Sequence, residues 1–211
     1  MDSLINSLLT GPEYIRGLKV QDIGIEFKKA HDSLISRIRK YDPKFRPTKI
    51  YSWYDNSNWP SLGLGIIRYK EGVGQVILVN SKVTPTNTEL EEYKRFLFVN
   101  SPNSDWNIMK STNPPSTLDF FNQLVSHEYA HLMEEKRGIE GKGLCNEAFA
   151  FWFIEVMTGF TSLFLSFRNH YNNLGLDFNK MEDVYDKLHS LSKTKGIEYT
   201  LNNAHQVVDV H

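Results

Sequence analysis

The sequence predicts a mostly helical α+β fold, with a small antiparallel sheet near the N-terminus and two helices that carry a cluster of His and Glu residues. Three observations lead to this prediction: short runs of β-branched and aromatic residues early in the chain, apolar residues at helical spacing on both sides of them, and helix-capping patterns in the second half. The 211 residues, 40% of them hydrophobic, are enough to bury one sizeable core. We therefore expect a single domain over residues 1–211, with a helix-and-sheet lobe over 1–100 and a helical lobe over 116–211.

A long first helix is predicted over residues 20–41, where apolar side chains recur every three or four residues. These side chains are Ile23, Phe27, Ala30, Leu34, Ile38 and Tyr41. Three strands are predicted after it, from the segments TKIYSWY, LGIIRYK and QVILVN, which are rich in residues that favour strands. The short link EGVG joins the last two segments, so we expect them to form a hairpin.

A helix over residues 88–99 is predicted by Thr88 and Glu91, which have the spacing of a capping box. Residues 100–116, rich in Asn, Ser and Pro, follow it. We interpret this segment as a long surface loop inside one domain, because neither half of the chain alone holds a complete core.

Helices account for the rest of the predicted fold. Ser116 and Asp119 form another capping pattern, and helical spacing continues from there to Gly138. After the turn GIEGKG, a second helix is predicted from near Asn146 and a third over about residues 179–193.

An apolar run raises the question of a membrane span: it covers residues 149–167, FAFWFIEVMTGFTSLFLSF. Glu155 lies inside it, and Gly159 and several hydroxyl residues follow. We interpret the run as a buried helix kinked at Gly159, since a charged side chain is costly inside a bilayer. No membrane span is therefore expected.

Charge and cysteine content narrow the range of functions. The chain has 24 basic and 25 acidic residues, so no electropositive surface for nucleic acid or anionic membrane is expected. Cys145 is the single cysteine and cannot form an internal disulfide. Residues 1–14 lack the basic region and the cleavage site of a signal peptide. Both features predict a reducing, cytoplasmic setting.

The segment VSHEYAHLMEE contains two histidines four residues apart, with a glutamate directly after the first. On a helix, His127 and His131 lie one turn and about 40° apart, so both imidazoles can reach one ion. Glu128 is rotated by about 100° from His127, which suits it to polarising a bound water rather than to ligation. The motif arises by chance in roughly 1.5% of chains of this composition. The alternative is a solvent-facing helix with two ordinary histidines.

A catalytic zinc takes three protein ligands and leaves the fourth position to water, so a third ligand is sought after the motif. The candidates are the later histidines and the acidic residues Glu134, Glu135, Glu140, Glu147 and Glu155. Glu134 lies one more turn along the helix, too far from His127 to share an ion, and we interpret it and Glu135 as solvated or ligand-supporting carboxylates. Glu140 lies in the glycine-rich turn and is a weak candidate. Glu147 opens the next helix, and a short turn can bring its carboxylate to the two imidazoles.

The segments HEYAH and NEAFA together resemble the gluzincins, the zinc peptidases with two His and one Glu as ligands, among them thermolysin-like enzymes and zinc aminopeptidases. The resemblance covers about thirty residues of the chain and implies a zincin-like domain that binds Zn²⁺. The implied site residues are the ligands His127, His131 and Glu147, the general base Glu128 and the orienting residue Asn146. The metzincin pattern is excluded, because the Gly and the third His that it requires are absent.

The chain also departs from the gluzincin pattern. The gap between His131 and Glu147 is shorter than in the aminopeptidases, Ala148 replaces their usual Gly, and Phe151 stands where thermolysin-like enzymes carry an Asp that supports a histidine ligand. No GxMEN-type stretch for binding a free amine is present. The resemblance therefore implies a minimal, divergent gluzincin with endopeptidase activity.

The expected activity is zinc-dependent hydrolysis of a peptide bond in a peptide or protein substrate, with Glu128 as general base for a zinc-polarised water. The residue that donates a hydrogen bond to the oxyanion is expected from a later segment, as in the family. The candidates are Tyr199 and His205, and His170 and Tyr171 are nearly as good. The predicted hairpin has an edge strand that can pair with an extended peptide. The alternatives are a non-catalytic, metal-stabilised interaction protein and a membrane-embedded protease. Glu128 favours the enzyme, because a structural site needs the ligands but not this carboxylate.

Overall fold

Helices make up most of the computed structural model, which describes residues 19–54, 65–70, 74–80, 117–139, 145–159 and 177–209. The strands are β1 (Lys19–Asp22), β2 (Lys49–Tyr54), β3 (Gly65–Lys70) and β4 (Gly74–Asn80). The helices are α3 (Ile25–Arg39), α6 (Thr117–Arg137), α7 (Cys145–Thr158), α9 (Phe178–Lys195), α10 (Ile197–Asn203) and α11 (His205–Val208). The predicted mostly helical α+β class is confirmed for this part of the chain. The helix predicted over residues 88–99 and the loop predicted over 100–116 lie outside it.

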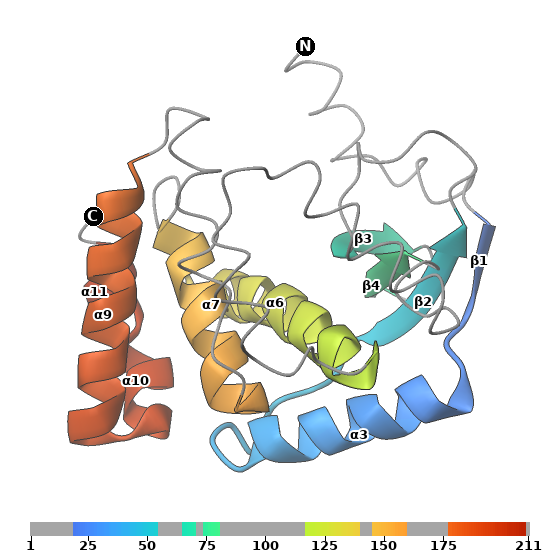
Figure 1. Ribbon diagram of the computed structural model, residues 1–211, viewed down its shortest axis with the longest axis horizontal. Helices are drawn as coiled ribbons and strands as arrows, with labels where there is room; N and C mark the ends of the chain where they lie inside the picture. Colours follow the sequence, from blue (N-terminus) through green and yellow to red (C-terminus); the bar gives the residue numbers. More distant parts are fainter. Residues whose placement is uncertain are drawn as a thin grey trace.

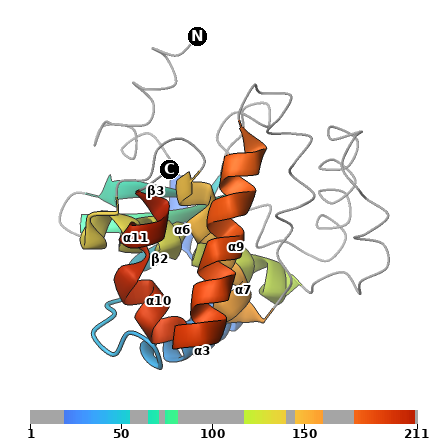
Figure 2. The same ribbon diagram turned by 90° about the vertical axis from the view of Figure 1, so that its left-hand side faces the viewer.

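The elements form successive layers, with the sheet on one side of α6 and α7 on the other (Figure 1). α7 packs in turn against α9, and α3 packs against both α6 and α7. The short helices α10 and α11 pack against α9 (Figure 2). α6 is therefore the central helix of the described structure.

The described strands form one mixed sheet in the order β1-β2-β4-β3. The three predicted strands and the hairpin between β3 and β4 are confirmed. The prediction of an antiparallel sheet is wrong for the inner pair, because β2 and β4 run parallel, with Ile50 opposite Ile77. The reason lies in β4, whose side chains Val76, Ile77, Leu78 and Val79 are fully buried, as in an inner strand that is covered on both faces. Placing β4 beside β2 leaves β3 at the edge and makes the inner pair parallel.

The first predicted helix is shorter than expected, because its first residues form a strand. β1, which contains Val20, pairs antiparallel with β2, and α3 begins only at Ile25. Pairing with β2 satisfies the backbone groups on one side of β1, and this tertiary contact overrides the helical spacing. The predicted apolar face of the helix is otherwise confirmed, since Leu34 and Ile38 are buried. Partly buried side chains that pack against the same core are Ile23, Phe27, Ala30 and Tyr41.

The two helices α6 and α7 supply many of the largest buried side chains. These include Phe121 and Tyr129 of α6 and Phe149, Trp152 and Phe153 of α7. On α6, Val125 and Leu132 are buried along with Phe121. α7 is apolar on nearly all sides because α6, α3 and α9 cover it.

The helix α7 ends at Thr158. A kink at Gly159 was predicted, but the helix terminates just before this residue. Gly159 has φ +76°, a left-handed conformation that glycine commonly adopts just after a helix. Arg37 of α3 donates hydrogen bonds to the carbonyl oxygens of Met157 and Thr158, which satisfies acceptors in the last turn. Residues 160–167 of the apolar run lie outside the described residues. Among the described helices, none has the length and apolar character needed to cross a membrane.

Tyr129 connects the back of α6 to α3 and to the start of β2. Its hydroxyl lies 2.6 Å from Nε2 of His31 and donates a hydrogen bond of 3.1 Å to the carbonyl oxygen of Thr48. Tyr129→Phe is expected to lower the free energy of unfolding by about 1–3 kcal/mol, because both partly buried partners lose their hydrogen bond. Urea unfolding measures this effect. Tyr199→Phe, at a side chain that is 43% exposed, is the control and should change the value by less than about 0.5 kcal/mol; equal effects of the two variants would contradict the prediction.

Candidate metal centre

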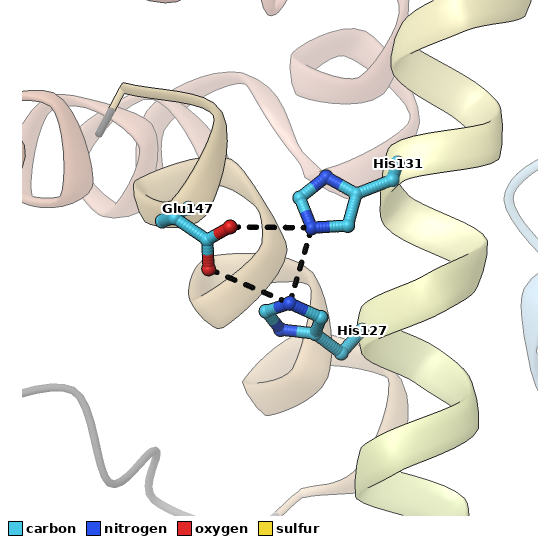
Figure 3. Close-up of side chains that lie close together, drawn as sticks. All are labelled: His127, His131 and Glu147. Atoms are coloured by element: carbon cyan, nitrogen blue, oxygen red, sulfur yellow. Dashed lines mark hydrogen bonds and ion pairs between the residues drawn. The ribbon is translucent and has the colours of Figure 1, made fainter. Parts of the chain in front are cut away.

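Three side chains from two neighbouring helices converge at the N-terminal end of α7 (Figure 3). α6 presents His127 and His131 one helical turn apart, and α7 presents Glu147 in its first turn. Nε2 of His127 lies 3.1 Å from Nε2 of His131. The two carboxylate oxygens of Glu147 lie 3.4 Å from Nε2 of His127 and 3.5 Å from Nε2 of His131. The structure thus brings together the three residues that were predicted as ligands.

The spacing of these atoms fits a metal ion. One ligand atom from each residue lies within 4.8 Å of the other two. A tetrahedral ion with bonds of ~2.1 Å holds its ligand atoms roughly 3.4 Å apart. The two Nε2 atoms lie 3.1 Å apart, and each lies 3.4 or 3.5 Å from a different oxygen of the Glu147 carboxylate. The group formed by His127, His131 and Glu147, called the triad below, can therefore hold a metal ion with little rearrangement.

Solvent reaches all three side chains of the triad. Their exposed fractions are 22% for His127, 26% for His131 and 28% for Glu147. Structural zinc sites are normally closed by four protein ligands, whereas catalytic sites keep one position open. Within the described residues the cluster contains three ligands. The triad therefore has the composition and the accessibility of an open site.

The two histidines have opposite charge states in the metal-free protein. Burial lowers the pKa of His127 to about 4, against the attraction of Glu147. Burial by itself also lowers the pKa of His131, but hydrogen bonds with Glu134 and Glu147 outweigh it and raise this pKa to about 10. For Glu147, burial raises the pKa, and the interactions with both histidines more than reverse this, so that its pKa is lowered. These shifts favour a positively charged His131 beside a neutral His127 and an ionised Glu147 at neutral pH.

Each histidine of the triad has a different neighbour behind it. Nδ1 of His131 lies 2.8 Å from Oε2 of Glu134, whose side chain is 4% exposed. The ring of His127 instead packs edge-on against Phe151, with ring centroids 5.8 Å apart. Glu134 is therefore buried against His131 rather than solvated, and its predicted ligand-supporting role stays a prediction. The signal in the sequence is its spacing of three residues from His131 on one helix.

Two other acidic candidates make their contacts elsewhere. Oε2 of Glu155 lies 2.8 Å from Nε2 of His189 on α9. Glu135 is exposed and accepts a hydrogen bond from Gln75 of β4. Neither belongs to the metal-ligand cluster that is found among the described residues.

The predicted catalytic residues occupy different parts of the fold. Glu128 follows His127 on α6 and is 7% exposed. Tyr199 lies in α10 and His205 opens α11; both are exposed, and in the described part of the chain neither side chain bonds to the triad. The side-chain oxygen of Asn146 is buried, with no hydrogen-bond partner among the described residues. The roles of these residues stay predictions. Outside the described residues lie Glu140, His170 and Tyr171.

Binding of a divalent metal ion is expected to release about one proton per ion at pH 7. Both imidazoles must be unprotonated to bind a metal, and His131, with its pKa raised to about 10, carries the proton that has to leave. Because this pKa lies above the working range, the apparent affinity should rise roughly tenfold per pH unit between about pH 6 and pH 8. Calorimetric titration in buffers of different ionisation enthalpy counts the protons. A pH-independent affinity without proton release would contradict the assigned charge states.

No family model, curated protein or solved structure matches the chain. The resemblance to the gluzincins therefore rests on the two segments HEYAH and NEAFA. The structure brings these segments together from adjacent helices and places their two His and one Glu at ligand spacing.

Proposed function

We propose that this protein is a zinc-dependent peptide hydrolase, a divergent gluzincin with a zincin-like fold that acts as an endopeptidase on a peptide or protein substrate. The observation that carries the proposal is the convergence of His127, His131 and Glu147, with one ligand atom from each residue within 4.8 Å of the other two. Two imidazoles and one carboxylate are a ligand set of catalytic zinc in peptidases. Imidazole nitrogens also favour zinc over magnesium and calcium, which prefer oxygen ligands.

The catalytic roles are proposed for a metal at the triad, for Glu128 and for two residues later in the chain. Zinc at the triad would act as a Lewis acid and lower the pKa of a bound water toward ~7. Glu128 takes a proton from the attacking water and passes it to the leaving amine, as general base and then general acid. Its burial shields it from bulk water, which strengthens electrostatic interactions in the site. Tyr199 or His205 donates a hydrogen bond to the developing oxyanion.

The alternative function is that of a non-catalytic, metal-stabilised interaction protein. Its metal site would normally be closed by a fourth protein ligand, and the cluster within the described residues has three. The ligands of the triad also remain partly exposed to solvent. A structural site has no need of the buried Glu128 beside its ligands. These features favour the enzyme.

Extended peptides are the proposed substrates. β3 lies at the edge of the sheet, where its described pairing is with β4, and it packs against α6. An edge strand can pair with a peptide through main-chain hydrogen bonds, which gives recognition that depends little on the substrate's sequence.

A reducing, cytoplasmic setting is proposed from the cysteine content. Cys145 is the single cysteine of the chain and lies buried at the start of α7. No disulfide within the chain therefore contributes to its stability. The nearly balanced charge of 24 basic and 25 acidic residues gives no basis for a nucleic-acid partner.

Metal analysis of the protein purified without added metal, combined with a peptide-library assay, tests the proposal. About one zinc ion per chain is expected, together with cleavage that stops on adding a chelator and returns with zinc. A protein that contains no zinc and takes up none at neutral pH would contradict the metal centre. One zinc per chain without cleavage of any peptide or unfolded protein would favour the non-catalytic alternative.

A further inference from the structure

Glu134 contacts the ring nitrogen of His131 that points away from the triad. Oε2 of Glu134 lies 2.8 Å from Nδ1 of His131, while Nε2 of the same ring lies 3.1 Å from His127 and 3.5 Å from Glu147. Both Glu134 and His131 lie on α6, three residues apart, so the helix itself sets the geometry of this contact. The His131 ring thus faces the Glu134 carboxylate with Nδ1 and the other two residues of the triad with Nε2.

The burial of Glu134 needs a compensating interaction, because a buried carboxylate is costly unless it is paired. Its side chain is 4% exposed. Among the described residues, Oε2 is paired with His131 and Oε1 is buried without a hydrogen-bond partner. Asp209, at the end of α11, lies close enough to add a like charge. A divalent cation at the triad would add positive charge on the other side of the His131 ring from Glu134.

We propose that Glu134 is a positioning residue of the metal centre. It accepts the hydrogen bond from Nδ1–H of His131, which fixes that tautomer and the orientation of the ring and leaves the Nε2 lone pair for the metal. This inference rests on the metal centre proposed above and adds a residue to it. In the thermolysin-like pattern the supporting carboxylate stands at the position of Phe151 on the second helix. Here it comes from the helix that carries both histidines.

The two histidine ligands are consequently held in different ways. His127 packs against the ring of Phe151, and no hydrogen bond to its Nδ1 is found among the described residues. A carboxylate behind a ligating imidazole makes the ring a stronger donor to the metal. His131 is therefore the stronger of the two imidazole donors, and its strength depends on Glu134.

The test compares Glu134→Gln and Glu134→Ala with the matched control Glu135→Gln. Glu135 is the adjacent residue on α6, is exposed, and bonds to Gln75 rather than to the triad. Zinc dissociation constants from competition with a chelator should rise roughly 10- to 100-fold in the Glu134 variants, more for alanine than for glutamine. For Glu135→Gln the constant should stay within about twofold of the parent value.

A second pair of measurements separates positioning from a general structural role. Nuclear magnetic resonance of ¹⁵N-labelled histidine detects the hydrogen-bonded Nδ1–H of His131, which should be present in the parent, with or without zinc, and lost in Glu134→Ala. Thermal unfolding in the presence of a chelator reports the stability of the metal-free fold. The midpoint for Glu134→Gln should fall by much less than the loss of zinc affinity would require, because the glutamine oxygen can still accept the hydrogen bond from His131 although the buried ion pair is lost.

The outcomes distinguish this inference from the proposed function. Parental zinc affinity in both Glu134 variants, or a His131 Nδ1–H signal that survives in Glu134→Ala, overturns the positioning role and leaves the metal centre standing. A weaker zinc affinity with a matching fall in the metal-free unfolding midpoint shows a structural role and also overturns it. Failure of the parent protein to bind zinc overturns the metal centre and this inference together. Weakened zinc binding with the Nδ1–H signal lost and the metal-free fold intact supports the inference.

Discussion

Glu147→Ala is expected to remove most of the bound metal, from about one ion per chain in the parent to well below half an ion. The variant leaves two imidazoles as protein ligands and removes the carboxylate whose two oxygens lie 3.4 and 3.5 Å from their Nε2 atoms. It also removes the negative charge that would balance part of the charge of the ion. Mass spectrometry of the metal content after gel filtration measures the effect.

Glu155→Ala is the matched control for this substitution. Glu155 lies on the same helix two turns later, and its carboxylate pairs with His189 rather than with the triad. The control should keep its metal and the Glu147 variant should lose it. Full metal occupancy in Glu147→Ala would show that another residue is the third ligand.

Glu128→Gln is expected to lower kcat by roughly 10²- to 10⁴-fold while the metal content stays at the parental level. Glutamine has nearly the same shape as glutamate but cannot take the proton of the attacking water. Because Glu128 is not counted among the ligands of the triad, its substitution should change kcat far more than KM or zinc affinity. Steady-state kinetics on a peptide identified in the library assay, with metal analysis of the same preparation, measure both effects.

The Glu135→Gln variant is again the control, since its exposed carboxylate bonds to Gln75 of β4. It changes the same functional group on the same helix and should leave kcat unaltered. Hydrolysis at the parental rate by Glu128→Gln would refute the assignment of the general base. Loss of metal from Glu128→Gln would instead give Glu128 a role in holding the ligands.

The histidine pair was predictable because its geometry is local. Four residues along any α-helix bring two side chains onto one face one turn apart, and the apolar spacing around His127 and His131 was enough to predict the helix. The contact between His131 and Glu134 has the same origin. The spacing of three residues allowed that contact. The burial of Glu134, whose side chain is 4% exposed, could not be predicted, because it depends on which distant segments pack around α6.

The position of Glu147 could be predicted from the sequence only in part. Periodicity predicted a helix starting near Asn146, and the similarity of NEAFA to a known motif suggested the ligand. Its arrival within 3.5 Å of both imidazoles depends on the packing of α7 against α6. No count of residues between the two motifs fixes that packing.

The sheet shows what only the tertiary structure decided. The strand segments and the hairpin follow from local composition and a short link, but strand order is a competition between pairings that are similar in local energy. β4, whose side chains from Val76 to Val79 are fully buried, became an inner strand of the sheet. The pairing of β1 with β2 replaced the start of a predicted helix by a strand.

The sequence by itself therefore determined the helices α3, α6, α7 and α9, the strand segments of β2, β3 and β4, and which residue types could hold a metal ion, because these depend on neighbours within about one or two helical turns. The tertiary structure decided the parallel inner pair, the separation between Glu147 and the histidines, and the burial of Glu134. These features arise when segments far apart in the chain bury their apolar faces against one another, and that long-range packing sets which polar groups end up in contact.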